Sequence, residues 1–304
     1  MTVLVFGSLN LDLVAYAKNL PTLGQTLTGE KLLRFPGGKG LNQAIAAKRS
    51  GSEVFMVGAL GRDSEGEFLN QVLEREKIDS RFISTVEAQT GIAVIEVSAD
   101  AQNRILIIPG ANATLKFEEQ FLSSPKVPKV CLAQLETPIG EVSKFINKAK
   151  DAGCITVLNP APIQELSSEL LAACDYLVVN ESEASYLTGN TVEKLNLKEA
   201  SDIGKNLISK GAKSVVINLA ENGSLFLDKH DEIYTPAFKI NAVDTTAAGD
   251  AFCGAFATAL AEGKAISYCL KFASAAGALS ATKAGAVPSL PNSDEILSML
   301  ASVQ

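Results

Sequence analysis

Short runs of consecutive apolar residues alternate with stretches of helical periodicity along most of the chain. The apolar runs are rich in β-branched residues, as strands buried on both faces of a parallel sheet are. They lie at Val3–Phe6, Val54–Val57, Val130–Leu135, Ile155–Leu158, Tyr176–Val179 and Val215–Ile217. Helical patterns occupy residues 39–50, 63–76, 141–152, 165–173, 181–188, 197–210, 250–262, 265–283 and 293–303. This alternation predicts an α/β fold with a doubly wound, mostly parallel sheet flanked by helices.

Two segments depart from the alternation, because Leu11–Phe35 and Thr90–Ile108 contain strand-like residues with no helix between them. In the second segment, TGIAVIEV and RILIIPG are separated by the turn SADAQN and predict a hairpin. We expect these strands to form a small β-sheet lid over a ligand site. The chain has no low-complexity linker, so residues 1–304 are expected to form a single domain, with lid strands from about 11–35 and 90–108.

Composition narrows the function classes. The chain has 304 residues, of which 47% are hydrophobic and 20% charged, which is typical of a soluble globular protein. No apolar stretch approaches the roughly 18 residues of a membrane span. The start, MTVLVFGSLN, lacks the features of a signal peptide, so a cytoplasmic protein without a membrane partner is expected. A net charge of −7 without a basic stripe argues against nucleic-acid binding.

The cysteines and the one histidine exclude several kinds of site. The five cysteines are odd in number and none is in a CxxC pair, so buried free thiols are expected instead of zinc or disulfides. The single histidine, His230, lies in the charged turn DKHDE between two short strand patterns and is expected to be solvated. Catalysis by a Ser-His-Asp or Cys-His system is therefore not expected.

Ligands of doubly wound proteins bind beyond the carboxyl ends of the strands, and several polar segments lie there. In FPGGKGLNQAIAAKRSG, Gly37 and Gly38 can bring the backbone close to a ligand, or form only a tight turn before a helix. Lys39 and Asn42, at i and i+3, can both face that ligand. The segment is not a Walker A loop, because GxxxxGK[ST] is absent.

Three further segments follow strands. In GSLNLD, Asn10 and Asp12 alternate onto one side and suit sugar hydroxyls, although each alone is typical of a turn. QLETP, which is followed one strand later by NPAP, contains Glu136, a hydroxyl acceptor or a helix-entry carboxylate. In NESE, Asn180 and Glu183 form a capping pair or hold a hydrated Mg²⁺ ion.

The last segment, DTTAAGDAFCGAF, begins an apolar helical pattern at Asp250. The residues before it, Ala247, Ala248 and Gly249, are small enough to leave an open nest of backbone N–H groups that binds anions. Asp250 is either a helix cap or an acceptor beside a phosphoryl group. Phosphoryl transfer asks mainly for positioning and charge stabilisation, which such a nest and carboxylate supply.

These segments, in this order, resemble the ribokinase/PfkB family of carbohydrate kinases. GGKGLNQAIAAKRSG and DTTAAGDAFCGAF are the diagnostic stretches; GSLNLD, PTLGQTLTG, GRDSEGE, QLETP, NPAP, NESEASYLTG and KAGAVPSLP extend the resemblance over nearly the whole chain. It implies a ribokinase-like fold and a kinase that transfers the γ-phosphoryl group of ATP to a primary sugar hydroxyl, with Mg²⁺ bridging the phosphates. D-Ribose is the expected acceptor. Fructose, another sugar or a nucleoside is the alternative, and a non-catalytic sugar-binding protein is a third.

The resemblance also assigns roles to residues at matching positions. Asp250 would be the catalytic base, with Ala247, Ala248 and Gly249 as the anion hole. The sugar would be held by Asn10, Asp12, Gly38, Lys39, Asn42, Glu136 and Asp250. The nucleotide and Mg²⁺ would lie against Asn180, Glu183, Asn218, Leu219, Ala220, Glu221, Asn222, Gly223, Gly249 and Ser274. An activating K⁺ ion would be bound by Asp244, Thr246, Ser280, Lys283, Gly285 and Ser289, several of them through backbone carbonyls.

The chain departs from the family pattern at a few positions. Asn218-Leu219-Ala220 stands where Thr-Leu-Gly is common, and Ser274 where His is common on the adenine side. Both changes bear on nucleotide affinity, with Ala220 expected to narrow the nucleotide loop. Leu41 replaces a commoner Ala and either reshapes the sugar pocket or packs inward. The resemblance further implies a homodimer through the lid strands, whose exposed edges invite pairing.

Overall fold

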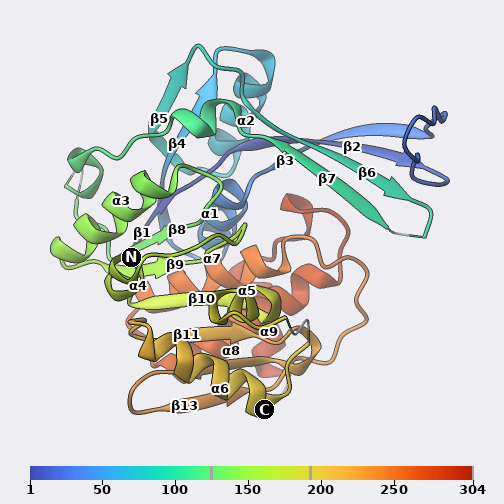
Figure 1. Cartoon of the computed structure of the whole chain (residues 1–304). Coiled ribbons are helices and arrows are strands. Elements are labelled where there is room, and N and C mark those ends of the chain that lie inside the picture. Colours follow the sequence, from blue (N-terminus) through green and yellow to red (C-terminus); the bar gives the residue numbers. More distant parts are fainter. Residues whose placement is uncertain (101, 124–125, 192–193, 303–304) are drawn as a thin grey trace.

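The apolar runs form one nine-stranded sheet in the computed structural model, which describes residues 1–100, 102–123, 126–191 and 194–302 (Figure 1). In sheet order the strands are β13 (Glu232–Thr235), β12 (Ser224–Leu227), β11 (Val215–Asn218), β10 (Tyr176–Asn180), β9 (Ile155–Leu158), β8 (Val130–Ala133), β1 (Thr2–Phe6), β4 (Glu53–Gly61) and β5 (Asp79–Val86). Neighbours from β11 to β5 pair in parallel, and β12 and β13 add two antiparallel strands at one edge. The predicted doubly wound, mostly parallel sheet is confirmed.

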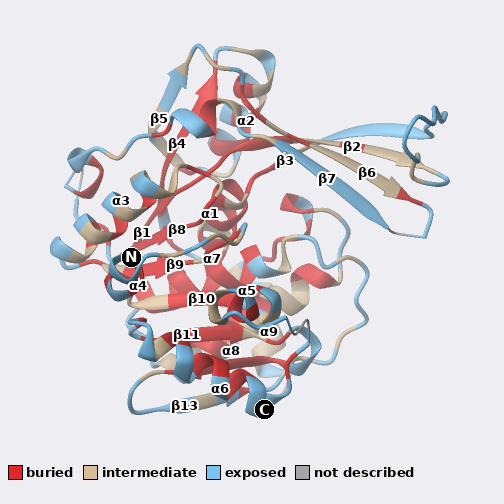
Figure 2. Cartoon of the chain, in the orientation of Figure 1, coloured by how far each residue is buried: buried red, intermediate tan, exposed pale blue. Residues whose placement is uncertain are grey.

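Helices cover both faces of this sheet and bury its central strands, whereas the edge strands β5 and β13 are partly exposed (Figure 2). One face packs against α1 (Lys39–Arg49), α2 (Ser64–Arg75), α7 (Ala248–Ala261), α8 (Ile266–Ala281) and α9 (Ser293–Ala301). The other packs against α3 (Ile139–Asp151), α4 (Ser168–Ala173), α5 (Glu181–Thr188) and α6 (Leu197–Ser209). Helix α7 is apolar on nearly all sides because it lies between the sheet and other helices.

A second sheet extends away from this body (Figure 1). Its four strands, in order, are β3 (Lys31–Gly37), β2 (Asn10–Ala17), β6 (Gly91–Ser98) and β7 (Asn103–Ile108). β2 pairs with β3 and β6 with β7 in antiparallel fashion, while β2 and β6 run in parallel. The predicted hairpin is thus β6–β7, and we call the four strands the small sheet.

Some predicted boundaries are wrong. The sequence pattern misses β5, since Asp79–Val86 mixes partly buried with exposed residues and has no clean apolar run. The strand expected to reach Leu135 ends at Ala133, and the helix expected from 165 begins at Ser168, which is preceded by the N-cap Ser167. Ala101 of the predicted turn and Val303 at the end of the last predicted helix lie outside the described residues.

The predictions for the cysteines and for His230 are confirmed. All five cysteines are buried and free, and His230 is exposed between β12 and β13. Leu41 is fully buried in the core, so it packs inward. Within the described chain, no helix is both long and apolar enough to cross a membrane.

Candidate active site

The order of the strands reverses between β1 and β8, since β1 is followed along the chain by β4 on one side and the later strands continue on the other. Crevices at such a switch point are where doubly wound proteins bind ligands. Ser8, Glu136 and Asn159 follow the carboxyl ends of β1, β8 and β9. The sheet therefore gathers the polar segments of the sequence at one edge.

The loop between β3 and α1 brings Gly38 against the start of β2. Gly38 has φ of 89°, and a Cβ there would lie 2.8 Å from the backbone N of Asn10. Only glycine tolerates both the left-handed backbone and this close approach. The glycines of this loop thus bring the start of α1 next to Asn10.

Glu136 holds the same loop from the neighbouring strand. Its Oε2 accepts from the backbone N–H of Lys39 at 3.0 Å and from Oγ of Ser8 at 2.5 Å. Glu136 is therefore a helix-entry carboxylate. The helix that it stabilises is α1, whose own first turn has no acidic residue. Its Oε1 has no hydrogen-bond partner among the described residues.

Asp250 lies in the first turn of α7, 8% exposed, and is tied to α1. Its Oδ2 accepts from Nδ2 of Asn42 at 3.0 Å, and its Oδ1 accepts from Nε2 of Gln43 at 2.9 Å. In the described chain it makes no hydrogen bond to the backbone of its own helix, so it does not cap α7. Oδ1 of Asn42 is buried without a partner there, which leaves an acceptor for a ligand hydroxyl.

Gln43 is a site residue that the sequence reasoning missed. It is fully buried, and its Nε2 donates both to Asp250 and to Oδ1 of Asn159 at 3.0 Å. Its Oε1 accepts from Nε2 of Gln134 at 2.6 Å. These residues stand in the segments GGKGLNQ, NPAP and QLETP, so the motifs contained them, but only the packing of α1 against α7 shows their role.

The site carries more negative than positive charge. Burial works to lower the pKa of Lys39, but the carboxylates of Asp250, Glu136 and Glu183 raise it above its usual range. Burial, together with Glu136 and Asp250, raises the pKa of Asp12 to about 7. Burial also raises the pKa of Glu183. Three carboxylates thus act on the Lys39 ammonium group, and Asp12 adds a fourth acidic side chain beside Glu136 and Asp250.

The turn before α7 forms the predicted nest in part. Ala247 is in the left-handed conformation, with φ of 60°. The N–H of Ala248 is engaged with the Thr245 carbonyl at 3.1 Å, so it is not free for an anion as predicted. The N–H groups of Ala247, Gly249 and Asp250 have no partner among the described residues, and these three can bind an anion.

The predicted nucleotide residues lie along the ends of β10 and β11. Asn180 and Glu183 form a capping box at the start of α5, with bonds of 2.8 and 2.9 Å, so the capping role is confirmed. Oδ1 of Asn218 accepts from the N–H of Ala220 at 3.0 Å. Ala220 has φ of 48°, where glycine is favoured, so its departure from the family strains the backbone by about 1 kcal/mol.

Other residues of the predicted nucleotide loop contact the rest of the protein. Leu219 is fully buried in the core, so only its backbone could contact a nucleotide. Glu221 pairs with Lys194 at 3.0 Å, and the Asn222 carbonyl accepts from the Tyr234 hydroxyl at 2.9 Å. Gly223 has φ of 93°. Ser274 of α8 lies beside this loop, with its Oγ 3.4 Å from Oγ of Ser224.

The predicted cation residues meet where the loop before α7 joins the chain after α8. Asp244 accepts from the N–H of Thr246 at 2.9 Å and of Gly285 at 2.8 Å. These bonds outweigh the effect of burial and lower the pKa of Asp244. The hydroxyls of Ser280 and Ser289 are buried and 2.7 Å apart. The Lys283 ammonium turns away to Glu295 at 2.8 Å, so only its backbone could serve a cation.

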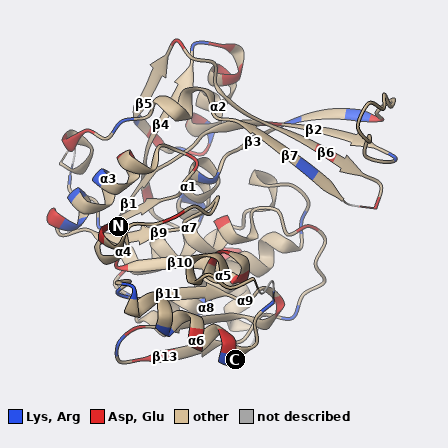
Figure 3. Ribbon diagram, viewed as in Figure 1, with Lys and Arg blue, Asp and Glu red and all other residues tan. Residues whose placement is uncertain are grey.

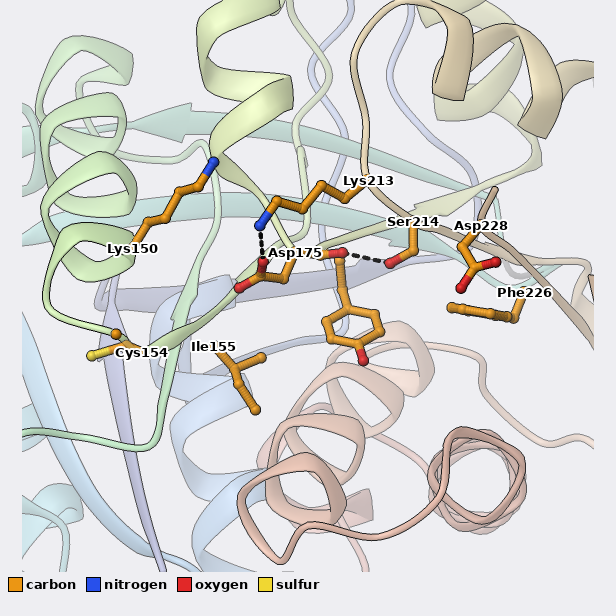
Figure 4. Close-up of a pocket in the computed structure, with 10 residues that line it drawn as sticks. Lys150, Cys154, Ile155, Asp175, Lys213, Ser214, Phe226 and Asp228 are labelled. Carbon is orange, nitrogen blue, oxygen red and sulfur yellow. Dashed lines mark hydrogen bonds and ion pairs between the residues drawn. The ribbon is translucent and has the colours of Figure 1, made fainter. Parts of the chain in front are cut away.

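A pocket of about 490 Å³ lies at the opposite end of the sheet (Figure 4). It is lined by residues at the amino ends of β9, β10 and β11, among them Lys213 and Asp175, which pair at 2.5 Å. None of the groups around Asp250 contributes to it. We therefore assign the active site by its chemistry, at the switch point, and not by the size of this hollow.

Comparison with known proteins agrees with this geometry. The family described as "pfkB family carbohydrate kinase" matches residues 2–293. The chain belongs to the pfkB family of carbohydrate kinases. A ribokinase of Haemophilus influenzae is 39% identical over 98% of both chains, and a deoxyribokinase of Salmonella typhi is 34% identical over 97% of both. The structure of Arabidopsis thaliana ribokinase complexed with ribose and ATP is similar at a TM-score of 0.90, 31% identity and 98% coverage of each chain.

Proposed function

We propose that this carbohydrate kinase transfers the γ-phosphoryl group of ATP to the primary hydroxyl of D-ribose, giving D-ribose 5-phosphate. The observation that carries the proposal is the Asp250 carboxylate, which two amides orient beside three backbone N–H groups that have no partner in the described part of the chain. A binding protein has no need of a carboxylate next to an anion nest. The ribokinases and the deoxyribokinase among its relatives support a pentose as the acceptor.

Each part of the site has one task in this reaction. Asp250 accepts the proton of the attacking hydroxyl, whose oxygen forms a bond to the γ-phosphorus as the bond to the β-phosphate oxygen breaks. The N–H groups of Ala247, Gly249 and Asp250 stabilise the charge on the transferred group. Asn10, Asp12, Lys39 and Asn42 hold the sugar so that its primary hydroxyl faces Asp250.

The charge of the site fits a divalent cation. Asp12, Glu136, Glu183 and Asp250 outnumber Lys39, and an unneutralised polyphosphate would be repelled by them. We propose that Mg²⁺ is bound with ATP near Asn180 and Glu183, where it would neutralise phosphate charge. Because Glu183 is committed to its capping box, it would act on the ion through water.

The nucleotide would lie over the loop from Asn218 to Gly223, with Ser274 on its base side. A K⁺ ion would lie between Asp244 and the chain around Gly285, with ligands from this carboxylate, from backbone carbonyls and from the buried hydroxyls of Ser280 and Ser289. Hard cations prefer such oxygen ligands. We also propose a cytoplasmic homodimer with small-molecule substrates and no nucleic-acid partner. The absence of a nucleic-acid partner is proposed because the Lys and Arg residues of the chain are interspersed with Asp and Glu and are not gathered on one element (Figure 3).

A sugar panel tests the proposal. With ATP as donor, D-ribose should show a higher kcat/KM than 2-deoxy-D-ribose, D-fructose and adenosine. The deoxyribokinase relative makes 2-deoxy-D-ribose the strongest competitor. A kcat/KM for fructose more than tenfold above that for ribose would overturn the assignment. Absence of any phosphorylated product would instead favour a non-catalytic sugar binder.

A further inference from the structure

A buried amide joins the chain returning from the small sheet to the start of the sugar site. Asn112 lies in the 3₁₀ turn Gly110–Thr114, after β7, and is 1% exposed. Its Oδ1 accepts from the N–H of Leu9 at 2.9 Å. Its Nδ2 donates to the carbonyl of Leu9 at 3.0 Å and to Oδ1 of Asn10 at 2.8 Å. One side chain thus makes three buried hydrogen bonds to residues about a hundred positions earlier.

The polarity of the Leu9 backbone orients both amides. Since a backbone N–H only donates and a carbonyl only accepts, Asn112 must place Oδ1 toward the first and Nδ2 toward the second. The same Nδ2 also donates to Asn10, which must therefore accept through its Oδ1. The Nδ2 of Asn10 is left on the other side and has no partner among the described residues. Asn10 therefore offers a donor to the sugar site.

We propose that Asn112 is a positioning residue that fixes Asn10 as a hydrogen-bond donor to one hydroxyl oxygen of the sugar. The inference rests on the proposed sugar kinase function and refines how it selects its substrate. Asp12, two residues along β2 and so on the same face as Asn10, can only accept when ionised. A hydroxyl that accepts from Asn10 keeps its own proton to donate to such a carboxylate.

Gly91 provides an independent test of the contact. It pairs with Asn10 in the register of β2 and β6. A Cβ on Gly91 would overlap both Nδ2 of Asn112 and Oδ1 of Asn10. The backbone of Gly91 is outside the left-handed region, so alanine is tolerated there by the backbone itself. Gly91→Ala therefore disturbs the Asn10–Asn112 bond from the opposite side.

The experiment compares Asn112→Asp and Gly91→Ala with the wild-type protein. Binding is measured by calorimetry without nucleotide, and kcat and KM with ATP, for D-ribose and for its monodeoxy and monofluoro-deoxy analogues. Fluorine can accept weakly but cannot donate. At one hydroxyl position the wild type should bind the fluoro analogue more tightly than the deoxy analogue. In Asn112→Asp the carboxylate that replaces Nδ2 can only accept a hydrogen bond, so the Asn10 amide should rotate to donate to it. The preference for the fluoro over the deoxy analogue should then vanish.

Ribose binding should weaken about tenfold or more in both variants, while kcat and the KM for ATP change less than about threefold. Gly140→Ala and Asn147→Asp are matched controls. Among the described residues, a Cβ on Gly140 meets nothing within 4 Å, and Asn147 bonds only to Ser143 within α3. Both should behave as the wild type does.

An unchanged ratio of fluoro to deoxy binding in the two variants would overturn the inference, since a merely structural residue weakens all sugars alike. If Asn112→Asp does not fold, Gly91→Ala decides alone, with its melting temperature compared to that of Gly140→Ala. A wild-type protein that phosphorylates no pentose would instead contradict the proposed function.

Discussion

Buried carboxylates dominate the behaviour of the site at the scale of single residues. Asp250 is held by two amides through both of its oxygens, whereas Asp12 has no hydrogen-bond partner among the described residues. Asp12 is instead buried, and it lies near the negative charges of Glu136 and Asp250. Burial and both charges disfavour its ionised form. The two aspartates of the proposed sugar site are therefore suited to different tasks, Asp250 as an oriented base and Asp12 as a group that responds to pH.

Asp250→Asn should abolish most turnover, because the amide cannot accept the proton of the sugar hydroxyl. We expect kcat to fall by about 10²–10⁴, the range for loss of a general base. Steady-state kinetics with ribose and ATP measure it. Asp294→Asn is the matched control, since Asp294 is an exposed first-turn acid of α9. Turnover within a factor of three of the wild type would remove Asp250 from the mechanism.

Asp12 should make the stability of the ligand-free protein depend on pH. Its pKa is about 7 in the fold against 3.8 as a model value, so the folded state holds the proton more tightly. Its contribution to the free energy of unfolding is therefore complete below about pH 4 and is lost as the pH rises through 7. The gap corresponds to about 4 kcal/mol.

Urea unfolding at pH 4.5 and pH 8 of the wild type and of Asp12→Asn measures this effect. The wild type should lose more stability over that interval than the variant, because the amide does not titrate. Equal losses in the two proteins would show that Asp12 is not the responsible group.

At the scale of elements, the turn that precedes α7 is strained and is stabilised by contacts outside the helix. Ala247 occupies a left-handed conformation that costs a non-glycine residue about 1 kcal/mol. Asp244 holds the same turn by bonding to Thr246 on one side and to Gly285, beyond α8, on the other. The nest of N–H groups thus depends on contacts between two loops, not on the helix alone.

Asp244→Ala should loosen this junction and remove a ligand of the proposed K⁺ site. The loss of two hydrogen bonds to a carboxylate should lower the free energy of unfolding by about 2–5 kcal/mol. The wild-type rate should be higher in K⁺ than in tetramethylammonium, and the variant should lose most of that difference.

Asp228→Ala is the control for this change, because Asp228 also accepts two backbone N–H bonds, but in the turn between β12 and β13. It should lose some stability and keep the full response to K⁺. Equal wild-type rates in the two cations would contradict the cation site, whatever the variant does.

For the whole molecule, the small sheet is the part that lacks a covering layer. Its edge strands β3 and β7 expose Leu32 at 65%, Ile105 at 57% and Leu106 at 66% (Figure 2). Unpaired strands with exposed apolar side chains favour association. We expect two copies to cover these surfaces in a homodimer.

Leu106→Glu should shift the dimer toward monomer, because the carboxylate would have to be buried in the interface. Light scattering at several protein concentrations measures the mass. Leu297→Glu, on the far helix α9 and 48% exposed, should leave the mass unchanged. A wild-type protein that is monomeric throughout would contradict the dimer.

The sequence by itself determined the local features of this protein. Apolar runs indicated the strands of the parallel sheet, and glycines indicated the turn at Gly38. The motifs identified Asp250 as a candidate base and indicated the family of the chain. Only the tertiary structure decided which groups meet: Glu136 with the start of α1, Gln43 with Asp250 and Asn112 with Asn10, pairs separated by 97, 207 and 102 residues. The raised pKa of Asp12 likewise follows from burial among other carboxylates. Periodicity encodes how each element faces its neighbours, whereas such contacts depend on strand order and helix packing, which no local pattern contains.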